Sequence, residues 1–341
     1  MLCVVVTSRL QMDVGKHVRE MLEGFGLKTV LLSEVKDVRD DEGIVVVPAT
    51  GGTERIIANI IEKSDVPVMI WALPHHNSLA SALEVYSLYR DRVRLHYSPI
   101  TSLEGLERFV GMCRVLSGVK IGVVGGVSDW LLSVGDLPKF VEIVEIGFDE
   151  LEGDIFEALR RVSKGLSAIT VKCFDLIEHG ITACLPLAML DIPAGCEGDL
   201  NAVFTMLLIR EIFGKPSWMA NVCRLSPLVL AHCTVPLKMV EDYELTTHAE
   251  SGKGVAVRGK LKRGTVTLAK YGKGRLLLMK GRVVGNLREK GLCRTQAVVE
   301  CDEEFLVENI VGNHVVLAYG DLRKDLRDFC KLAGIKCVER R

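Results

Sequence analysis

The sequence predicts a mixed α/β protein in which two doubly wound Rossmann/flavodoxin-like domains precede a small β-barrel-like C-terminal domain. As far as about residue 238, continuous runs of Val, Ile and Leu alternate with segments whose apolar residues recur at helical spacing. Runs that are apolar at every position are typical of parallel strands buried on both faces. Beyond residue 238, short strands broken by Gly and Lys favour a barrel. We therefore expect domains at 1–117, 118–238 and 239–341.

The first domain is expected to contain a helix over 14–25 and strands at 2–6, 29–32, 44–47 and 66–71. Polar loops follow the last two of these strands. One holds a Gly-Gly turn that opens a helix, and the other holds two adjacent histidines. Ligands bind beyond the carboxyl ends of such strands, and helix N-termini attract polar oxygens. Candidate substrate contacts are therefore Thr53, Glu54 and His76, with a plain turn and a polar helix cap as the alternative interpretations.

The second domain is expected to open with a strand that starts at Lys120 and ends in a glycine turn. Its other predicted elements are strands at 140–146 and 168–174 and helices at 156–162, 183–190 and 202–213. The glycine turn does not have the spacing G-x-G-x-x-G, and no acidic residue ends a well-placed second strand. A dinucleotide site is therefore disfavoured.

The third domain is expected to contain short strands at 255–257, 264–269, 275–279, 281–284, 296–300 and 315–318, with a closing helix over 321–332. Small barrels can bind single-stranded nucleic acid, and the segment from Lys253 to Arg294 is rich in basic residues. Tyr271 is the single aromatic residue in that segment. Lysines on solvent-facing strands are the favoured interpretation, and we expect no nucleic-acid partner.

The composition indicates a soluble cytoplasmic protein. The net charge is −1, so no overall field attracts nucleic acid or membrane. No apolar run reaches the ~20 residues that span a bilayer, and residues 1–6 are typical of a strand and not of a signal peptide. The eleven cysteines are scattered without a C-x-x-C pair. Reduced, mostly buried thiols are therefore expected.

A candidate metal site begins at two acids that precede the apolar helix over 202–213. Glu197 and Asp199 are two residues apart and do not share a helix face. One is expected to enter a site while the other caps the helix, and caps at both positions are the alternative. His232 and His314 adjoin apolar runs, where a buried structural histidine is the alternative. Together with Asn221 they form a set of oxygen and nitrogen ligands suited to Mn²⁺ or another divalent cation.

Around these residues the sequence resembles the L-fucose/L-arabinose isomerase superfamily. The resemblance covers the chain from about Val119 onward, and the first domain resembles the family mainly in architecture. It is carried by these short motifs in order: Gly51-Gly52-Thr53-Glu54, Glu197-Gly198-Asp199, Ala231-His232 followed by Val235-Pro236, His248-Ala249-Glu250-Ser251-Gly252, Gly264-Thr265-Val266-Thr267-Leu268, and Gly312-Asn313-His314 followed by Gly320-Asp321.

The resemblance implies a metal-dependent aldose–ketose isomerase that acts through an enediol and forms a homo-oligomer, either a trimer or a hexamer. Its small-molecule partner would be a sugar or sugar derivative. Glu197, His232 and His314 would hold Mn²⁺ with the help of Asn221, and Glu197 would be the principal base. His248 and Asn313 are further candidate substrate contacts.

Asn221 departs from the family pattern, which has an acid in this stretch. Its amide oxygen can coordinate a hard metal, but it cannot take up a proton. Glu197 and Asn221 are nevertheless the predicted catalytic pair, with Asp199, Glu250 and His248 as alternatives for the second proton-transfer group. The missing charge would weaken metal binding and suit an anionic substrate. A non-catalytic or regulatory sugar-binding protein is the alternative function.

Overall fold

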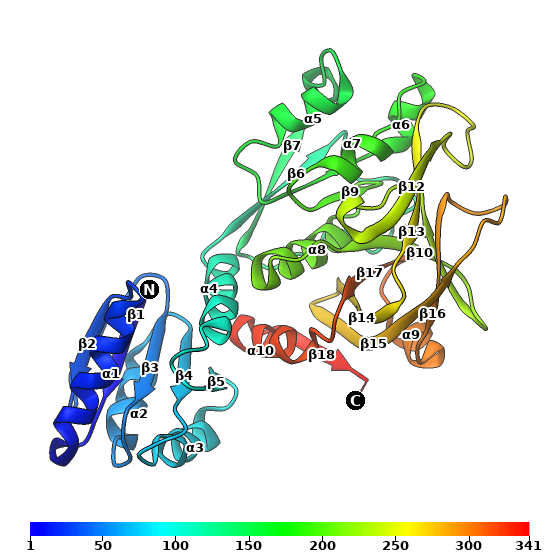
Figure 1. The fold of residues 1–341 in the computed structure, drawn as a ribbon. Helices are drawn as coiled ribbons and strands as arrows, with labels where there is room; N and C mark the ends of the chain where they lie inside the picture. The colour runs from blue at the N-terminus through cyan, green and yellow to red at the C-terminus, as the bar shows by residue number, and fades with distance from the viewer. Residues whose placement is uncertain (341) are drawn as a thin grey trace. The chain divides into compact units, whose positions relative to one another are not determined.

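The computed structural model describes residues 1–340, which form two compact units. Unit 1 comprises Met1–Ser117 with Asp328–Gly334, and unit 2 comprises Gly118–Arg327 with residues 335–340. Figure 1 shows the elements of each unit.

Unit 1 is built on a five-stranded parallel sheet with the strand order β2-β1-β3-β4-β5. Three of its strands are buried at every residue, which agrees with their continuous apolar sequences. One core contains α2 and α3 residues and the other contains α1 and α4 residues, so helices cover both faces. The predicted doubly wound sheet is confirmed in this unit. Its strands are β1 (Leu2–Val6), β2 (Thr29–Leu32), β3 (Ile44–Pro48), β4 (Val68–Ala72) and β5 (Val93–Tyr97), and its helices are α1 (Met12–Gly24), α2 (Glu54–Lys63), α3 (Ser78–Tyr89) and α4 (Glu104–Leu116).

Unit 2 begins with a second parallel sheet, in the order β7-β6-β8-β9. Its strands are β6 (Val119–Val124), β7 (Val141–Ile146), β8 (Ala168–Val171) and β9 (Ala194–Cys196). The associated helices are α5 (Ile155–Val162), α6 (Cys173–Glu178), α7 (Cys184–Met189) and α8 (Leu200–Phe213). The predicted strand over 168–174 is too long, because the chain leaves the sheet at Val171 and turns into α6.

A disulfide joins Cys173, at the start of α6, to Cys196, at the end of β9. The expectation that the thiols are reduced is therefore wrong for this pair. The two cysteines are 23 residues apart, and the pairing of β8 with β9 brings their Cα atoms to 6.0 Å. That proximity arises from the sheet and cannot be read from the spacing of cysteines along the chain.

The remainder of unit 2 contains a closed six-stranded antiparallel barrel, in the order β14-β17-β10-β11-β16-β15 with β15 paired back to β14. The predicted barrel is confirmed. Two of its strands come from residues 218–232, which precede the change of sequence pattern near residue 238. The strands are β10 (Trp218–Arg224), β11 (Leu228–His232), β14 (Gly264–Gly272), β15 (Arg275–Asn286), β16 (Thr295–Glu300) and β17 (His314–Tyr319).

Several smaller elements complete unit 2. A two-stranded ribbon is formed by β12 (Val240–Thr246) and β13 (Ala256–Leu261), and β18 (Lys336–Glu339) adds to β15 in parallel. The helices here are α9 (Glu303–Asn309) and the first part of α10 (Arg323–Ala333), whose residues from Asp328 onward belong to unit 1. The two strands predicted at 275–279 and 281–284 are one continuous strand, β15, because Gly281 stays in register opposite Val266.

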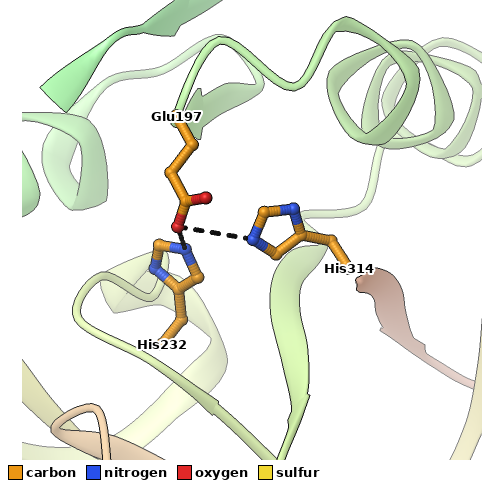
Figure 2. A group of neighbouring side chains, drawn as sticks. All are labelled: Glu197, His232 and His314. Atoms are coloured by element: carbon orange, nitrogen blue, oxygen red, sulfur yellow. Dashed lines mark ion pairs between the residues drawn. The ribbon is translucent and has the colours of Figure 1, made fainter. Parts of the chain in front are cut away.

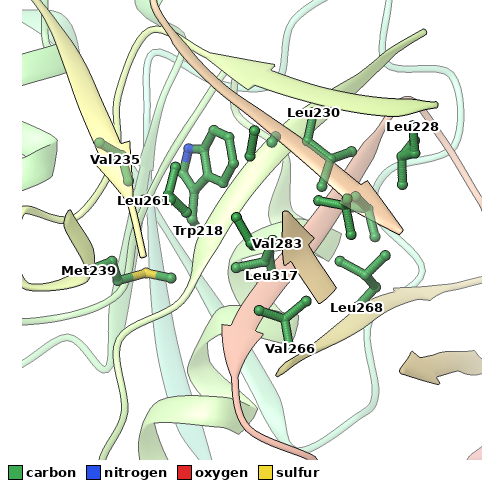
Figure 3. Packing of buried hydrophobic residues seen from close by; sticks show 14 of the residues in the cluster. Trp218, Leu228, Leu230, Val235, Met239, Leu261, Val266, Leu268, Val283 and Leu317 are labelled. Carbon is green, nitrogen blue, oxygen red and sulfur yellow. The ribbon is translucent and has the colours of Figure 1, made fainter. Parts of the chain in front are cut away.

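The barrel interior is filled by apolar side chains that alternate along its strands, including Trp218, Leu230, Leu268 and Leu317 (Figure 3). The Trp218 indole N–H is satisfied by the Thr234 carbonyl at 2.7 Å. Helix α8 is buried around almost its whole circumference and contacts both the parallel sheet and barrel strands β14 and β17. The N-terminus of α8 is thereby fixed between the two sheets of unit 2.

Candidate metal centre

A three-residue loop joins β9 to α8 and carries the first candidate ligand. Glu197 and Gly198 both adopt left-handed backbone conformations, with φ values of 62° and 69°. A Cβ at Gly198 would lie 2.4 Å from the Gly126 carbonyl oxygen and 2.6 Å from the Val127 Cα. Glycine is therefore required where this loop packs against the loop that follows β6. The loop lies at the carboxyl end of parallel strand β9, the edge at which α/β proteins bind ligands.

Three buried side chains meet at this edge (Figure 2). The Oε1 atom of Glu197 lies 3.8 Å from Nε2 of His232 and 3.5 Å from Nε2 of His314. One ligand atom from each residue lies within 4.8 Å of the other two. His232 is the last residue of β11 and His314 is the first of β17. Both strands pair with β10, so the strand order brings the two histidines to either side of β10. The structure thus brings together three of the four predicted metal ligands.

The two Nε2 atoms have no hydrogen-bond partner within residues 1–340, although both are buried. Buried polar atoms are normally paired, and an unpaired one costs about 1–3 kcal/mol. Metal–ligand distances of about 2.0–2.1 Å around a four-coordinate ion separate its ligand atoms by about 3.3 Å. The 3.5 and 3.8 Å separations to Glu197 are close to that spacing. The donor set and its geometry fit a divalent cation.

Asp199 lies beside this group and caps α8, as one of the two acids was expected to do. Its Oδ1 accepts the Ala202 backbone N–H at 2.8 Å. Its Oδ2 accepts hydrogen bonds from Lys270 Nζ at 2.6 Å and from His314 Nδ1 at 2.8 Å. Burial opposes ionisation of Asp199, but Lys270 and His314 outweigh it and lower the pKa of this carboxyl below its ordinary value. Asp199 is therefore an anion fully engaged by its neighbours.

The protonation of the three ligands differs. Burial opposes ionisation of Glu197, yet His314, His232 and the Trp130 indole together lower its pKa to about 2. Burial is the main cause that lowers the pKa of His232 to about 4. Burial also disfavours the charged form of His314, but the carboxylates of Asp199 and Glu197 outweigh it and raise its pKa. Without metal, His232 is thus neutral near pH 7, whereas the neighbouring carboxylates favour the charged form of His314.

Metal binding is expected to release about one proton per ion in the range where His314 is still charged. The ion competes with the proton on His314, so the affinity weakens as the pH falls, by about tenfold per pH unit. Calorimetric titration with Mn²⁺ in two buffers of different ionisation enthalpy measures the proton release. A release of two protons at pH 6 would contradict the assignment of a neutral His232.

Glu197 also forms part of the wall of a cleft of about 460 Å³. The Trp130 indole donates to Glu197 Oε2 at 2.8 Å, and the Trp130 ring lies edge-on to Phe174 at 4.9 Å between centroids. Oε1 therefore faces the histidines while Oε2 is held toward the cleft. The residues that line the cleft are Trp130, Phe174, Glu197, Asn221, Cys223, Glu250, Gly291, Leu292, Cys293 and Asn313.

Asn221 lies on this cleft wall, on β10 between the strands that carry the two histidines. It pairs in register with His314 on one side and Ala231 on the other. Its Oδ1 accepts a hydrogen bond from Asn313 Nδ2 at 3.1 Å. The two predicted amides therefore form a pair that faces the cleft.

The remaining predicted contacts lie elsewhere. His248 is buried beyond Phe174, with ring centroids 5.6 Å apart, and the adjacent Cys233 thiol raises its pKa. In unit 1, the buried Thr53 hydroxyl hydrogen-bonds with Ser81 and the Thr50 carbonyl. Glu54 begins α2, and His76 lines a separate cavity of about 330 Å³. His76 has a left-handed φ of 54°.

Trp130, Phe174 and Lys270 were missed by the sequence reasoning. Trp130 follows the glycine turn after β6, and a tryptophan in a loop at that edge of a sheet is a usable signal. Lys270 interrupts an otherwise apolar stretch of β14 and is only 2% exposed. A lysine within a buried strand is rarely left unpaired and could have indicated an anionic partner. Tyr271, the aromatic residue of the basic segment, is buried against Phe204 and is not available for base stacking.

The fold and this group of side chains describe a mixed α/β protein with a candidate site for a single divalent metal ion. No family model matches the chain, and no curated protein matches it. The chain is similar to the crystal structure of a cobalamin biosynthesis protein G homolog from Sulfolobus solfataricus, with 14% identity over 52% of this chain and 76% of that chain and a TM-score of 0.17. No helix in the described part of the chain is both long and apolar enough to cross a membrane.

Proposed function

We propose that the protein binds one divalent cation through Glu197, His232 and His314 and is an aldose–ketose isomerase of the L-fucose/L-arabinose isomerase type. The observation that carries the metal site is the pair of buried Nε2 atoms that face the Glu197 carboxylate and have no hydrogen-bond partner among the described residues. The adjoining cleft gives a substrate access to Glu197. The sequence motifs and the order of two parallel sheets and a barrel support the reaction type.

A bound divalent ion would polarise the sugar carbonyl and its neighbouring hydroxyl as a Lewis acid. The protein must then move a proton from C2 of the aldose to C1, through an enediol, while a hydroxyl proton passes from O2 to O1. The lowered pKa of Glu197 suits a metal ligand and makes it a weak base.

The sequence offers three candidates for the second proton-transfer group: Asp199, Glu250 and His248. Asp199 is buried and fully engaged by Ala202, Lys270 and His314. His248 is buried beyond the Phe174 ring. Glu250 is exposed and lines the same cleft as Glu197. We therefore assign proton transfer to Glu250 and leave Glu197 principally as a ligand.

The cleft lining supports an uncharged sugar as substrate. Trp130 and Phe174 present apolar ring surfaces that suit the C–H face of a sugar. The amides of Asn221 and Asn313 can donate to and accept from its hydroxyl groups. Among the described residues, those that line the cleft include no Lys or Arg. A phosphorylated or otherwise anionic substrate, which the loss of an acid at position 221 had favoured, therefore has less support.

Isomerisation of a panel of aldopentoses, 6-deoxyaldohexoses and their ketoses is the direct test, with the protein assayed with Mn²⁺ and after chelation. Conversion that depends on Mn²⁺ and is lost in Glu250→Gln is expected. The matched control is Glu289→Gln, because Glu289 is a partly exposed carboxylate paired with Arg224 at 2.9 Å and does not line the cleft. Conversion that survives chelation would exclude the metal mechanism, and full activity in Glu250→Gln would exclude Glu250 as the proton carrier.

A non-catalytic sugar-binding protein is the second candidate, favoured by the amide at Asn221 and its hydrogen bond to Asn313. This function predicts saturable sugar binding without exchange of the C1 or C2 protons in deuterated water. NMR detection of such exchange would exclude it and favour the isomerase.

A further inference from the structure

The Asp199 carboxylate makes more contacts than a helix cap requires. Its Oδ1 accepts the capping bond from Ala202, while its Oδ2 accepts from both Lys270 Nζ at 2.6 Å and His314 Nδ1 at 2.8 Å. Asp199, Lys270 and His314 are 1%, 2% and 0% exposed. Asn or Ser would cap the helix equally well, and an ion pair removed from water is costly. The contacts of Oδ2 therefore require a reason other than capping.

The contact with Asp199 determines which ring nitrogen of His314 carries a proton. An ionised carboxylate only accepts hydrogen bonds, so Nδ1 must be the donor. The lone pair of a neutral His314 is then on Nε2, which faces Glu197 Oε1 at 3.5 Å. At His232, by contrast, Nδ1 receives the Thr234 backbone N–H at 3.4 Å. His314 is thus oriented by a carboxylate, whereas a neutral His232 that accepts at Nδ1 carries its proton on Nε2 and must move it to Nδ1 before Nε2 can bind an ion.

Lys270 keeps the Asp199 charge compensated inside the protein. Its ammonium group reaches Asp199 from β14, on the barrel strand next to the one that carries His314. The ammonium group contacts the same Oδ2 atom that accepts from Nδ1 of His314, so it holds that oxygen in place for the ring.

We propose that Asp199 and Lys270 are positioning residues of the metal centre, which fix the tautomer and ring orientation of His314 so that Nε2 is presented to the ion. In this arrangement a carboxylate orients a histidine that binds the metal. Asp199 is itself fixed at the start of α8 by its hydrogen bond with the Ala202 N–H. The inference rests on the proposed metal site and is independent of the substrate.

Replacing Asp199 with Asn tests the role of the carboxylate. The amide can donate to Nδ1 of His314, and so favours the wrong tautomer. Mn²⁺ affinity is expected to fall by about 10–100-fold, and the visible absorption bands of the Co²⁺-loaded protein should shift. Lys270→Met is expected to weaken Mn²⁺ binding in the same direction. Affinity and Co²⁺ bands that match those of the wild type in Asp199→Asn would overturn the proposal.

Asp302→Asn is the matched control. Asp302 also caps a helix, accepting the Phe305 N–H at 2.9 Å, and also pairs with a cation, Arg340, at 2.7 Å. Within residues 1–340, Asp302 forms no hydrogen bond or ion pair with a ligand of the proposed centre, so Mn²⁺ affinity should be unchanged. A loss in Asp302→Asn equal to that in Asp199→Asn would reduce the effect to helix capping and overturn the proposal.

A measurement on the wild type keeps the inference testable if Asp199→Asn does not fold. Long-range ¹⁵N–¹H correlation of the histidine rings in the Zn²⁺-loaded chain reports which nitrogen carries the proton, with signals assigned from His232→Gln and His314→Gln. A proton on Nδ1 of His314 is expected, and a proton on Nε2 would overturn the proposal. A wild-type chain that binds no divalent ion would instead overturn the proposed function itself.

Discussion

Replacing Glu197 with Gln is expected to abolish both metal binding and any isomerisation. The substitution keeps the shape of the side chain and removes the charge that faces the Nε2 atoms of His232 and His314. Loss of an outer-shell partner costs about 10–100-fold in metal affinity, so loss of the anionic ligand should weaken Mn²⁺ binding by more than about 100-fold. Calorimetric titration with Mn²⁺ measures the affinity and stoichiometry, with one ion per wild-type chain expected.

Glu142→Gln is a suitable control for this experiment. Glu142 lies on β7 in the same unit and pairs with Lys120 at 3.1 Å at the surface. Its loss should leave Mn²⁺ affinity unchanged, because exposed pairs contribute little. If Glu197→Gln bound Mn²⁺ as tightly as the wild type, the proposed ligand set would be wrong.

Replacing Gly198 with Ala is expected to destabilise unit 2 and to weaken the metal site together. An alanine at position 198 would have to keep the left-handed backbone conformation of Gly198. Its Cβ would clash with backbone atoms of Gly126 and Val127, and no change of rotamer can relieve that clash. We expect the left-handed conformation to lower the free energy of unfolding by about 1–3 kcal/mol, and the clash to lower it further. Urea unfolding measures the stability and Mn²⁺ titration measures the displacement of Glu197.

Gly165→Ala separates the two causes. Gly165 has a left-handed φ of 79°, and nothing lies within 4 Å of the position that its Cβ would occupy. Gly165→Ala should therefore lose stability through the left-handed conformation alone, without a clash, and should retain full Mn²⁺ affinity. Equal losses of stability in the two variants would show that the close approach of the loops does not matter.

Local sequence patterns determined most of the secondary structure. The continuous apolar runs 2–6 and 44–47 are buried parallel strands, because a strand covered on both faces has no polar side. β5 was missed because Arg94 and His96 interrupt its apolar pattern. The strand predicted over 168–174 is longer than β8 because Cys173 and Phe174 continue the apolar run of the strand, although they belong to helix α6. Periodicity does not say where a buried run leaves a sheet.

At the candidate site, the sequence by itself supplied the residue types and one local relation. Spacing predicted different roles for Glu197 and Asp199, since residues two apart cannot share a helix face, and the family resemblance gave the metal to Glu197. Asp199 is the helix cap, and Glu197 points to the histidines. The convergence of Glu197 with His232 and His314 was expected from a family resemblance and was not forced by any local pattern.

The tertiary structure decided what the sequence could not. The pairing of β10 with β11 and β17 places the end of β11 and the start of β17 on either side of β10, and the loop before α8 places Glu197 beside them. The fold also brings Lys270 to Asp199 across 71 residues and Trp130 to Glu197 across 67. Such contacts depend on strand order and register, which non-local hydrogen bonds set. A linear sequence displays the groups that can bind a metal, but only the strand order and register of the folded sheets determine which of them meet.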